Sequence, residues 1–261
     1  MDSVDSKVSE DSKWIIKFGN KKAHVYNLFC IPMAGSGATL YRDWQKFFDF
    51  LNVCPIQLPG RENRITEELV DDPFELVDMM YEGIKGMLDM PFSIFGHSMG
   101  GFLAYELVKK IHRETGRYPV ILFISATSLK RCEDRKGVGK YSDSELADYL
   151  IENGGTSEEL LAMEEFREVY FPIIRNDYVL VDRYRGNGEK VGCPVRALAS
   201  ISDTEVPVSE TSDIAAVSDD FKITYFEGGH FYIRDHYDRV CTYVSETLRE
   251  AVGIRNEEMC I

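Results

Sequence analysis

The chain lacks long hydrophobic runs and an excess of positive charge. No uninterrupted apolar stretch in its 261 residues approaches the roughly 20 that a membrane-spanning helix needs. Thirty Lys and Arg stand against 44 Asp and Glu, which leaves a formal charge of −14 at pH 7. Because nucleic acids and anionic membranes bind basic surfaces, we expect neither as a partner.

Signals for export and paired cysteines are also missing. The first residues, Met1 to Ser6, are polar and acidic and do not have the pattern of a signal peptide. The six cysteines are scattered without a C-x-x-C pair, which argues against a metal cluster or a dithiol site. Cys30 and Cys54 lie in apolar, strand-like segments, and we expect buried free thiols there. We therefore expect a cytoplasmic protein with no metal and no bound cofactor.

The composition that is present is typical of a globular domain, with 44% hydrophobic and 28% charged residues. Apolar strand-like runs alternate with amphipathic helical patterns, which predicts a mostly parallel sheet flanked by helices. The expected strands are 14–18 (at an edge), 25–31, 53–58, 92–95, 120–126, 194–201 and 221–226. The expected helices are 41–51, 72–88, one that includes 102–108, 208–217 and 234–252.

The alternation stops between residues 129 and 185, where three helical stretches follow one another at 142–152, 157–163 and 164–183. We expect an interruption of the last stretch at Pro172, because proline cannot donate the helical hydrogen bond. This predicts a helical lid insertion, 129–185, in a core of residues 13–128 and 186–253, with flexible tails at 1–12 and 254–261. A helical extension that packs elsewhere is the alternative.

One segment combines a strand, a tight turn and a helix around a Gly-x-Ser-x-Gly pentapeptide. Phe92-Ser93-Ile94-Phe95 leads into Gly96-His97-Ser98-Met99-Gly100, and a helical pattern follows. Such a turn, the nucleophile elbow of α/β-hydrolases, exposes the serine hydroxyl at the helix N-terminus. We therefore predict an α/β-hydrolase fold with Ser98 as nucleophile. A glycine-rich turn without chemistry is the alternative.

A serine needs a base and an acid, and in this fold they follow it in the order Ser, acid, His. His24 precedes Ser98, His97 lies inside the elbow, and His112 follows too soon. His230 comes directly after an expected strand, in a Gly-Gly turn at the sheet edge where Ser98 lies. His236 falls within an expected helix, so His230 is the predicted base.

The acid is predicted to be Asp203, two residues after the strand that ends at Ile201. Glu205 is the nearest rival, and Asp213 falls in the helix that follows. A turn or a helix cap is the ordinary role of a single loop aspartate.

An oxyanion hole needs two backbone N–H groups near the nucleophile. One belongs to Met99, directly after Ser98. The other is expected from the loop that follows the strand 25–31, where we favour Ala34 over Met33.

Four segments together resemble the type II thioesterases that accompany polyketide synthases and non-ribosomal peptide synthetases. They are Leu28-Phe29-Cys30-Ile31-Pro32-Met33-Ala34-Gly35-Ser36-Gly37, Gln57-Leu58-Pro59-Gly60-Arg61-Glu62-Asn63-Arg64-Ile65, the elbow Phe95 to Gly101, and Gly228-Gly229-His230-Phe231. The Gln57–Arg64 segment discriminates most, since lipases and esterases share only the elbow. Met33 and Ser36 depart from the family pattern P-H-A-G-G, and Tyr232 replaces a Phe.

The resemblance implies hydrolysis of acyl thioesters on the phosphopantetheine arm of acyl or peptidyl carrier domains, which removes aberrant or stalled groups. It also implies Ser98, Asp203 and His230 as the triad, and we expect a monomer. A carboxylesterase or lipase, an acyltransferase, and a non-enzymatic binding protein on the same fold are the competing hypotheses.

Carrier domains of this kind are usually acidic, as this chain is, so docking calls for a local basic patch. Lys130, Arg131, Arg135 and Lys136 form one candidate, and Lys109, Lys110, Arg113 and Arg117 form the other. Solvated charge runs balanced by nearby acids are the alternative for both.

Overall fold

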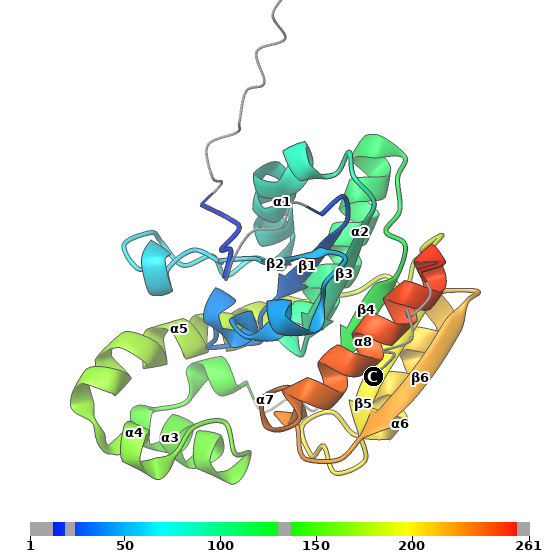
Figure 1. Cartoon of the computed structure of the whole chain (residues 1–261). Coiled ribbons are helices and arrows are strands. Elements are labelled where there is room, and N and C mark those ends of the chain that lie inside the picture. Colours follow the sequence, from blue (N-terminus) through cyan, green and yellow to red (C-terminus); the bar gives the residue numbers. More distant parts are fainter. Residues whose placement is uncertain (1–12, 19–23, 130–136, 255–261) are drawn as a thin grey trace, which may run out of the picture.

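A computed structural model describes residues 13–18, 24–129 and 137–254. Six strands form one sheet in the order β2-β1-β3-β4-β5-β6, and every neighbouring pair is parallel. They are β1 (Asn27–Ile31), β2 (Asn52–Pro55), β3 (Phe92–His97), β4 (Leu122–Ser125), β5 (Val195–Ser200) and β6 (Phe221–Phe226). The predicted α/β architecture is confirmed (Figure 1).

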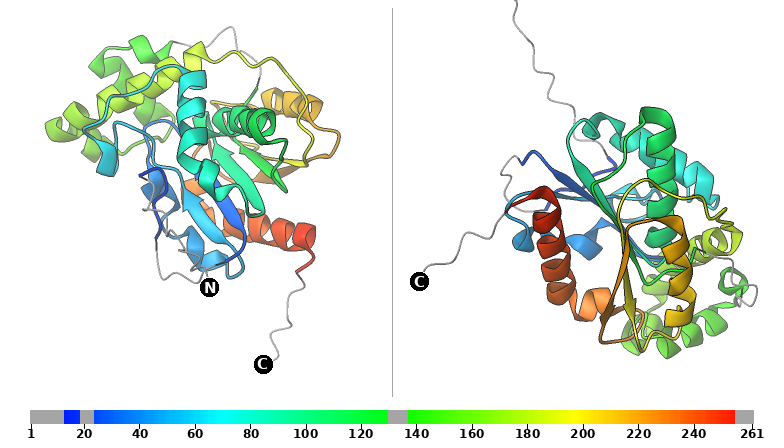
Figure 2. Two further views of the ribbon diagram at one scale, coloured as in Figure 1. Left: turned by 90° about the horizontal axis from the view of Figure 1, so that it is seen from above. Right: turned by 90° about the vertical axis from the view of Figure 1, so that its right-hand side faces the viewer.

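Helices cover both faces of the sheet (Figure 2). They are α1 (Pro73–Ile84), α2 (Met99–Thr115), α6 (Val208–Thr211), α7 (Tyr232–Asp235) and α8 (Tyr237–Val252). Alternate residues of β1 face opposite cores: Phe29 and Ile31 pack with residues of α1 and α2, whereas Leu28 and Cys30 pack with α8. The β1 residues are all buried, as expected for a central parallel strand.

A helical insertion lies between β4 and β5, at the lower left of Figure 1. It contains the short 3-10 helix η5 (Val138–Lys140), α3 (Asp143–Glu152), α4 (Glu158–Ala162) and α5 (Glu164–Arg183). Its apolar side chains form a small core of their own around Leu146, Leu150 and Phe171. Ser142 begins α3 with a capping box to Glu145, in which each side chain bonds the backbone of the other residue.

The predicted break of the last insertion helix at Pro172 is wrong, because α5 runs without interruption from Glu164 to Arg183. The carbonyl of Glu168 is the group that loses its helical partner. Since Glu168 is exposed, water can bond that carbonyl, and the helix continues at low cost.

The predicted edge strand 14–18 is also wrong. Ile15 makes one isolated antiparallel bridge with Ile56. The neighbouring strand β2 ends at Pro55, which has no N–H to continue a ladder.

The predicted helix 41–51 is instead two 3-10 turns, η1 (Ala38–Tyr41) and η2 (Trp44–Phe47). The Gln45 side chain bonds the carbonyls of Phe48 and Leu51 at 2.7 and 3.0 Å, so these groups close a loop. The expected helix 208–217 likewise consists of α6 and the 3-10 segment η6 (Ser212–Val217).

Three further expectations concern the end of the chain, its thiols and a membrane. The last helix is divided at His236, where α7 ends and α8 begins.

Cys30 and Cys54 are buried free thiols, as predicted. Within the part of the chain that the structure describes, no helix has both the length and the apolar character to cross a membrane.

Candidate active site

Ser98 occupies a sharp turn between β3 and α2. Its φ of 54° and ψ of −120° are strained for a residue with a side chain, as a nucleophile elbow requires. The turn is so tight that a Cβ on Gly96 would lie 1.9 Å from the carbonyl oxygen of Gly100. A Cβ on Gly100 would lie 2.3 Å from the carbonyl oxygen of Ile31. Both glycines are therefore required by close backbone contact.

The structure brings Ser98, His230 and Asp203 into one hydrogen-bonded row. The Nε2 atom of His230 lies 2.9 Å from Ser98 Oγ, and its Nδ1 lies 2.8 Å from Asp203 Oδ2. His230 follows β6 and Asp203 follows β5, so parallel strands deliver both to the same sheet edge. The other carboxylate oxygen of Asp203 accepts the backbone N–H groups of Glu205 and Val206, each at 2.9 Å.

Glu205, the rival acid, lies on the opposite side of the imidazole. Its Oε2 is 3.8 Å from His230 Nε2, the nitrogen that faces Ser98, and it does not bond Nδ1. The hydroxyl of Tyr149 on α3 also hydrogen-bonds Glu205. The geometry of a triad acid is thus found at Asp203, and Glu205 adds a second negative charge near the base.

The environment of His230 raises its pKa above the ordinary value. Burial alone lowers the pKa of this imidazole, but the hydrogen bond to Asp203 and the charges of Glu205 and Asp203 outweigh burial. Such an imidazole accepts a proton readily, which is the property that a general base requires.

His97 lies behind His230 and contacts its backbone. The ring of His97 is fully buried, with Nε2 3.0 Å from the carbonyl oxygen of His230 and Nδ1 2.8 Å from Ser125 Oγ. Burial lowers the pKa of His97 well below its usual range, so the ring is neutral. A carbonyl only accepts, so Nε2 carries the proton and Nδ1 accepts from Ser125. Ser125 Oγ in turn lies 2.5 Å from the hydroxyl of Tyr232.

The sequence analysis did not predict that His97 would hold the backbone of His230. The only indication in the sequence was that a histidine precedes the nucleophile. The ring nitrogens of His97 bond Ser125 and the His230 carbonyl rather than the serine hydroxyl. The remaining candidate, His236, lies between α7 and α8 near Gly228 and does not bond Ser98.

The predicted oxyanion donors flank the nucleophile. Met99 is buried at the N-terminus of α2, and Ala34 lines both cavities that open beside Ser98. Ala34 belongs to a turn closed by a 3.2 Å hydrogen bond from the Ser36 amide to the Met33 carbonyl. The alternative donor, Met33, is buried next to it.

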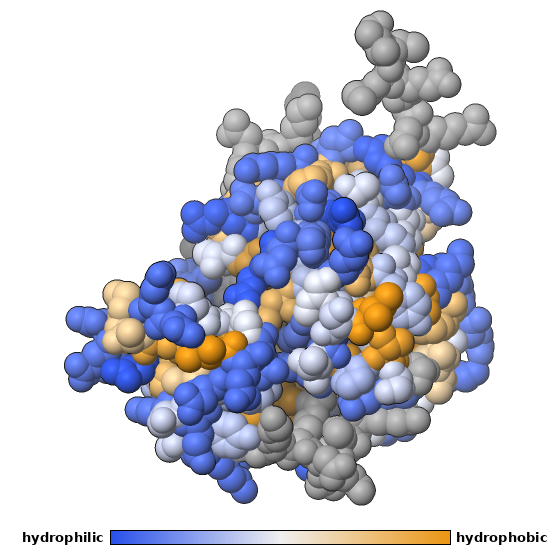
Figure 3. All heavy atoms as spheres, turned by 90° about the horizontal axis from the view of Figure 1, so that it is seen from below, coloured by the Kyte–Doolittle hydropathy of each residue, from blue (hydrophilic) through white to orange (hydrophobic). Residues whose placement is uncertain are grey.

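Two cavities meet at Ser98, and the insertion contributes to both. One, of about 210 Å³, has a polar lining that includes Thr127, Tyr149 and Glu205. The other, of about 340 Å³, has a more apolar lining that includes Leu160 and Phe166 of the insertion. Figure 3 shows hydrophobic residues among hydrophilic ones on the lobe that the insertion forms at the left. The site therefore offers separate space on two sides of the nucleophile.

Of the two candidate basic patches, only the second falls within the described residues. Lys130, Arg131, Arg135 and Lys136 lie outside the described residues. In the second patch, Lys109 is buried and its Nζ lies 2.8 Å from Glu106. Lys110 lies within 3.0 Å of both Asp78 and Glu114. Carboxylates on α1 and α2 thus pair the first two charges of this candidate, which agrees with the alternative of a charge run balanced by nearby acids for Lys109 and Lys110.

Comparisons with known proteins identify relatives of this chain. The chain is 29% identical over 246 residues to the gramicidin S biosynthesis protein GrsT of Aneurinibacillus migulanus, covering 93% of this chain and 96% of that protein. It is 30% identical to the medium-chain S-acyl fatty acid synthase thioesterase of Homo sapiens, covering 80% of this chain and 82% of that protein.

Solved structures are similar as well. The type II thioesterase BorB from the borrelidin biosynthetic cluster is 31% identical, with a TM-score of 0.82 over 92% of this chain and 100% of that chain. A lipase-esterase related protein of Clostridium acetobutylicum shares the fold, at 17% identity and a TM-score of 0.71 over 89% of this chain and 98% of that chain. The thioesterase domain model matches residues 26–248, so the chain belongs to the thioesterase family and has the α/β-hydrolase fold.

Proposed function

We propose that this chain is a serine thioesterase that hydrolyses acyl thioesters on the phosphopantetheine arm of carrier proteins. In this role it removes aberrant or stalled acyl groups during polyketide or non-ribosomal peptide synthesis. The observation that carries the proposal is the row Ser98–His230–Asp203, with contacts of 2.9 and 2.8 Å, where two cavities meet. GrsT and BorB, which belong to gramicidin S and borrelidin biosynthesis, support the pathway context.

In the first half-reaction, Ser98 Oγ attacks the thioester carbonyl carbon while His230 Nε2 takes the serine proton. The developing imidazolium is stabilised by Asp203, and the backbone N–H groups of Met99 and Ala34 bind the oxyanion. Collapse of the tetrahedral intermediate breaks the C–S bond. The pantetheine sulfur leaves as a thiol with the proton from His230, and the acyl group stays on Ser98.

In the second half-reaction, His230 removes a proton from water as the water attacks the acyl-serine carbonyl. The same two amides stabilise the second oxyanion. Collapse returns the proton to Ser98 Oγ and releases the carboxylic acid. The phosphopantetheine belongs to the substrate, and we propose no other cofactor for this chemistry.

Carrier proteins are the proposed partners, and the helical insertion is proposed as a lid over the acyl group. The more apolar cavity, with Leu160 and Phe166, suits a hydrocarbon chain. The net charge of −14 disfavours long-range attraction to an acidic carrier, so docking must depend on local contacts. We further propose that the protein acts as a monomer in the cytoplasm, where the buried thiols stay reduced.

The test compares hydrolysis of acyl-carrier protein, acyl-pantetheine and p-nitrophenyl esters by the wild type and two variants. Ser98→Ala should abolish turnover of all three, whereas Ser202→Ala, which alters an exposed serine, should preserve it. If the proposal holds, the wild type should hydrolyse the carrier-bound thioester fastest of the three substrates. Robust hydrolysis by Ser98→Ala would contradict the site, and a preference for p-nitrophenyl esters would favour an esterase.

A further inference from the structure

A buried ion pair joins the Gln57–Arg64 segment to the insertion. Arg61 Nη1 and Nη2 lie 2.6 and 2.8 Å from the two carboxylate oxygens of Asp177 on α5. The Arg61 side chain is 5% exposed and that of Asp177 is 1% exposed. Two parallel bonds of this kind fix both distance and orientation, which a lysine cannot reproduce.

Both members of the pair also bond the turn that carries Ala34. Asp177 Oδ2 accepts the backbone N–H of Gly35 at 2.8 Å. Arg61 Nη1 donates to the carbonyl oxygen of Ser36 at 3.2 Å. Gly35 has a φ of +73° at the third position of this turn, a conformation that residues with side chains rarely adopt. A carboxylate that holds its N–H stabilises this peptide orientation against a flip.

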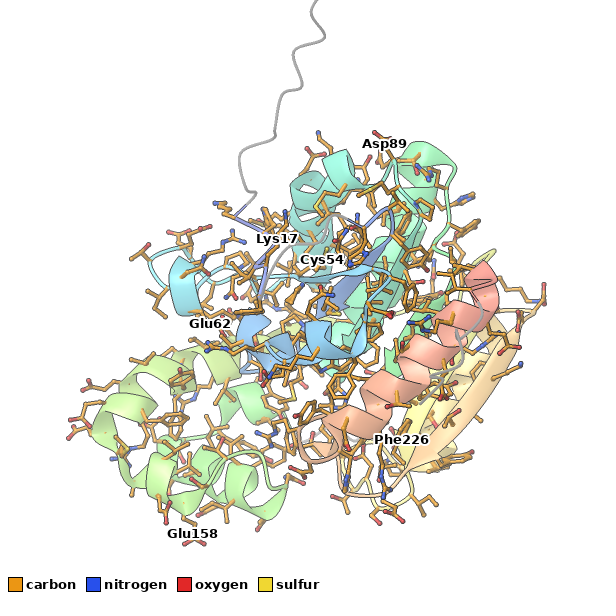
Figure 4. All side chains as sticks on the ribbon, in the orientation of Figure 1. Lys17, Cys54, Glu62, Asp89, Glu158 and Phe226 are labelled. Atoms are coloured by element: carbon orange, nitrogen blue, oxygen red, sulfur yellow. The ribbon has the colours of Figure 1, made fainter. Side chains whose placement is uncertain are left out.

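The next residue of the segment holds the other end of the same loop. The carboxylate of Glu62, a residue labelled in Figure 4, accepts hydrogen bonds from the hydroxyl of Thr39 and, at 3.3 Å, from the Thr39 backbone N–H. A Cβ on Gly37 would lie 2.4 Å from this carboxylate. The loop that follows β1 is therefore held at two points by Arg61 and Glu62.

We propose that Arg61 and Asp177 are positioning residues that hold the turn of residues 33–36, so that the Ala34 amide faces the oxyanion. This inference rests on the proposed function. Because Asp177 belongs to α5, the same pair couples the seating of the insertion to the geometry of the oxyanion hole.

The energetics of buried ion pairs support a geometric role. Removing two charges from water costs several kcal/mol per ion, and well-packed apolar residues in their place are often as stable. A pair of this kind is thus a weak source of stability, but it orients a loop. The oxyanion hole needs such orientation, since loss of one donor costs about 10²–10³ in kcat.

The same segment contains a matched control. Arg64 is also buried and also pairs with a carboxylate, at 2.9 and 2.6 Å from the oxygens of Glu67. Its Nη1 donates to the carbonyl of Gln57, and its Cζ lies 4.1 Å from the centroid of the Trp14 ring. None of its bonds in the described residues reaches the turn of residues 33–36.

The experiment compares Arg61→Lys with Arg64→Lys, and adds the double variant Arg61→Met/Asp177→Leu, which leaves no uncompensated charge. For each we measure kcat and KM on an acyl-pantetheine, stability in urea, and affinity for an alkyl boronic acid, which forms a tetrahedral adduct with the serine. The double variant should stay folded, with kcat reduced about 10²-fold, KM little changed and boronate affinity reduced in parallel. Arg61→Lys should show a smaller loss of kcat, and Arg64→Lys should keep the wild-type kcat.

Wild-type kcat in the folded double variant would overturn the inference, as would an equal loss of kcat in Arg64→Lys. A loss of kcat that only follows the folded fraction would also overturn it. If the wild type hydrolyses no thioester, the proposed function fails. The positioning role is then judged from kcat on p-nitrophenyl acetate, because the same oxyanion hole serves that ester.

Discussion

His97 offers the sharpest test of how the fold supports the base. In His97→Phe, a ring of similar size keeps the edge-on contact with Tyr232, whose centroid lies 5.4 Å away. The variant loses the Nε2 donor, so the buried carbonyl of His230 has no partner from this position. Ser125 is less affected, because the Tyr232 hydroxyl still bonds it at 2.5 Å. The orphaned His230 carbonyl and the Ser125 hydroxyl, whose proton loses its acceptor Nδ1, together set the cost.

A buried polar group without its partner costs about 1–3 kcal/mol. For a protein of this size, that loss corresponds to a decrease in Tm of roughly 2–4 °C per kcal/mol. The freed His230 backbone should also lower kcat about tenfold with little change in KM, because small displacements of a base are costly. Urea unfolding measures the first effect as a lower midpoint with an unchanged slope.

His97→Gln supplies the rescue, because its amide nitrogen can occupy the place of Nε2 and donate to His230. His97→Asn is too short to do so. The control His112→Phe keeps the stack on Tyr118, with ring centroids 4.0 Å apart, and should change stability by less than about 0.5 kcal/mol. If Phe, Asn and Gln at position 97 have equal kcat and equal stability, the His230 carbonyl does not need its donor and the reasoning is refuted.

Three further predictions concern the triad and its pH dependence. Asp203→Asn should lower kcat about 10⁴-fold while the protein stays folded, because His230 loses the acceptor that fixes its tautomer; near-normal turnover would exclude Asp203 as the acid. Glu205→Gln removes a charge that raises the pKa of His230, so the acid limb of the pH–rate profile should move to lower pH, and an unmoved limb would contradict this effect. The wild type should lose stability as pH falls below about 6.5, because the unfolded chain protonates His97 while the native ring, with its lowered pKa, stays neutral. This is measured by urea unfolding at several pH values from 5 to 8. In His97→Phe, the part of the change in unfolding free energy with pH that is due to His97 should vanish.

The sequence by itself determined the features that depend on neighbouring residues. Gly96 and Gly100 flank Ser98 because a strand that turns directly into a helix leaves no room for a Cβ, and this is visible as a pentapeptide. The central strands can also be predicted from the sequence, because a parallel strand that is buried on both faces is a continuous run of apolar residues. The chain order of serine, acid and histidine follows from the fold, so the sequence predicts His230 and Asp203 as partners of Ser98, and the structure brings the three side chains within hydrogen-bond distance.

Local sequence patterns gave wrong predictions where contacts between distant residues determine the backbone conformation. The spacing of aromatic residues from 41 to 51 predicts a helix, but packing of Tyr41 and Trp44 against Phe95 is compatible with two short turns. Pro172 was expected to divide α5, but the helix continues through it, and Glu168, whose carbonyl loses its helical partner, is an exposed residue. A charge run around Lys109 was interpreted as surface, although the fold buries that lysine against Glu106.

Only the tertiary structure decided how the site is held in place. His97 lies 133 positions from His230 in the chain, and Arg61 lies 116 positions from Asp177. No local pattern can pair residues so far apart, because their contact depends on how the strands are ordered and how the insertion folds back. The same reason explains Asp203 and Glu205: both are carboxylates in one loop, and only the three-dimensional course of that loop directs Asp203 to Nδ1 and Glu205 towards Nε2.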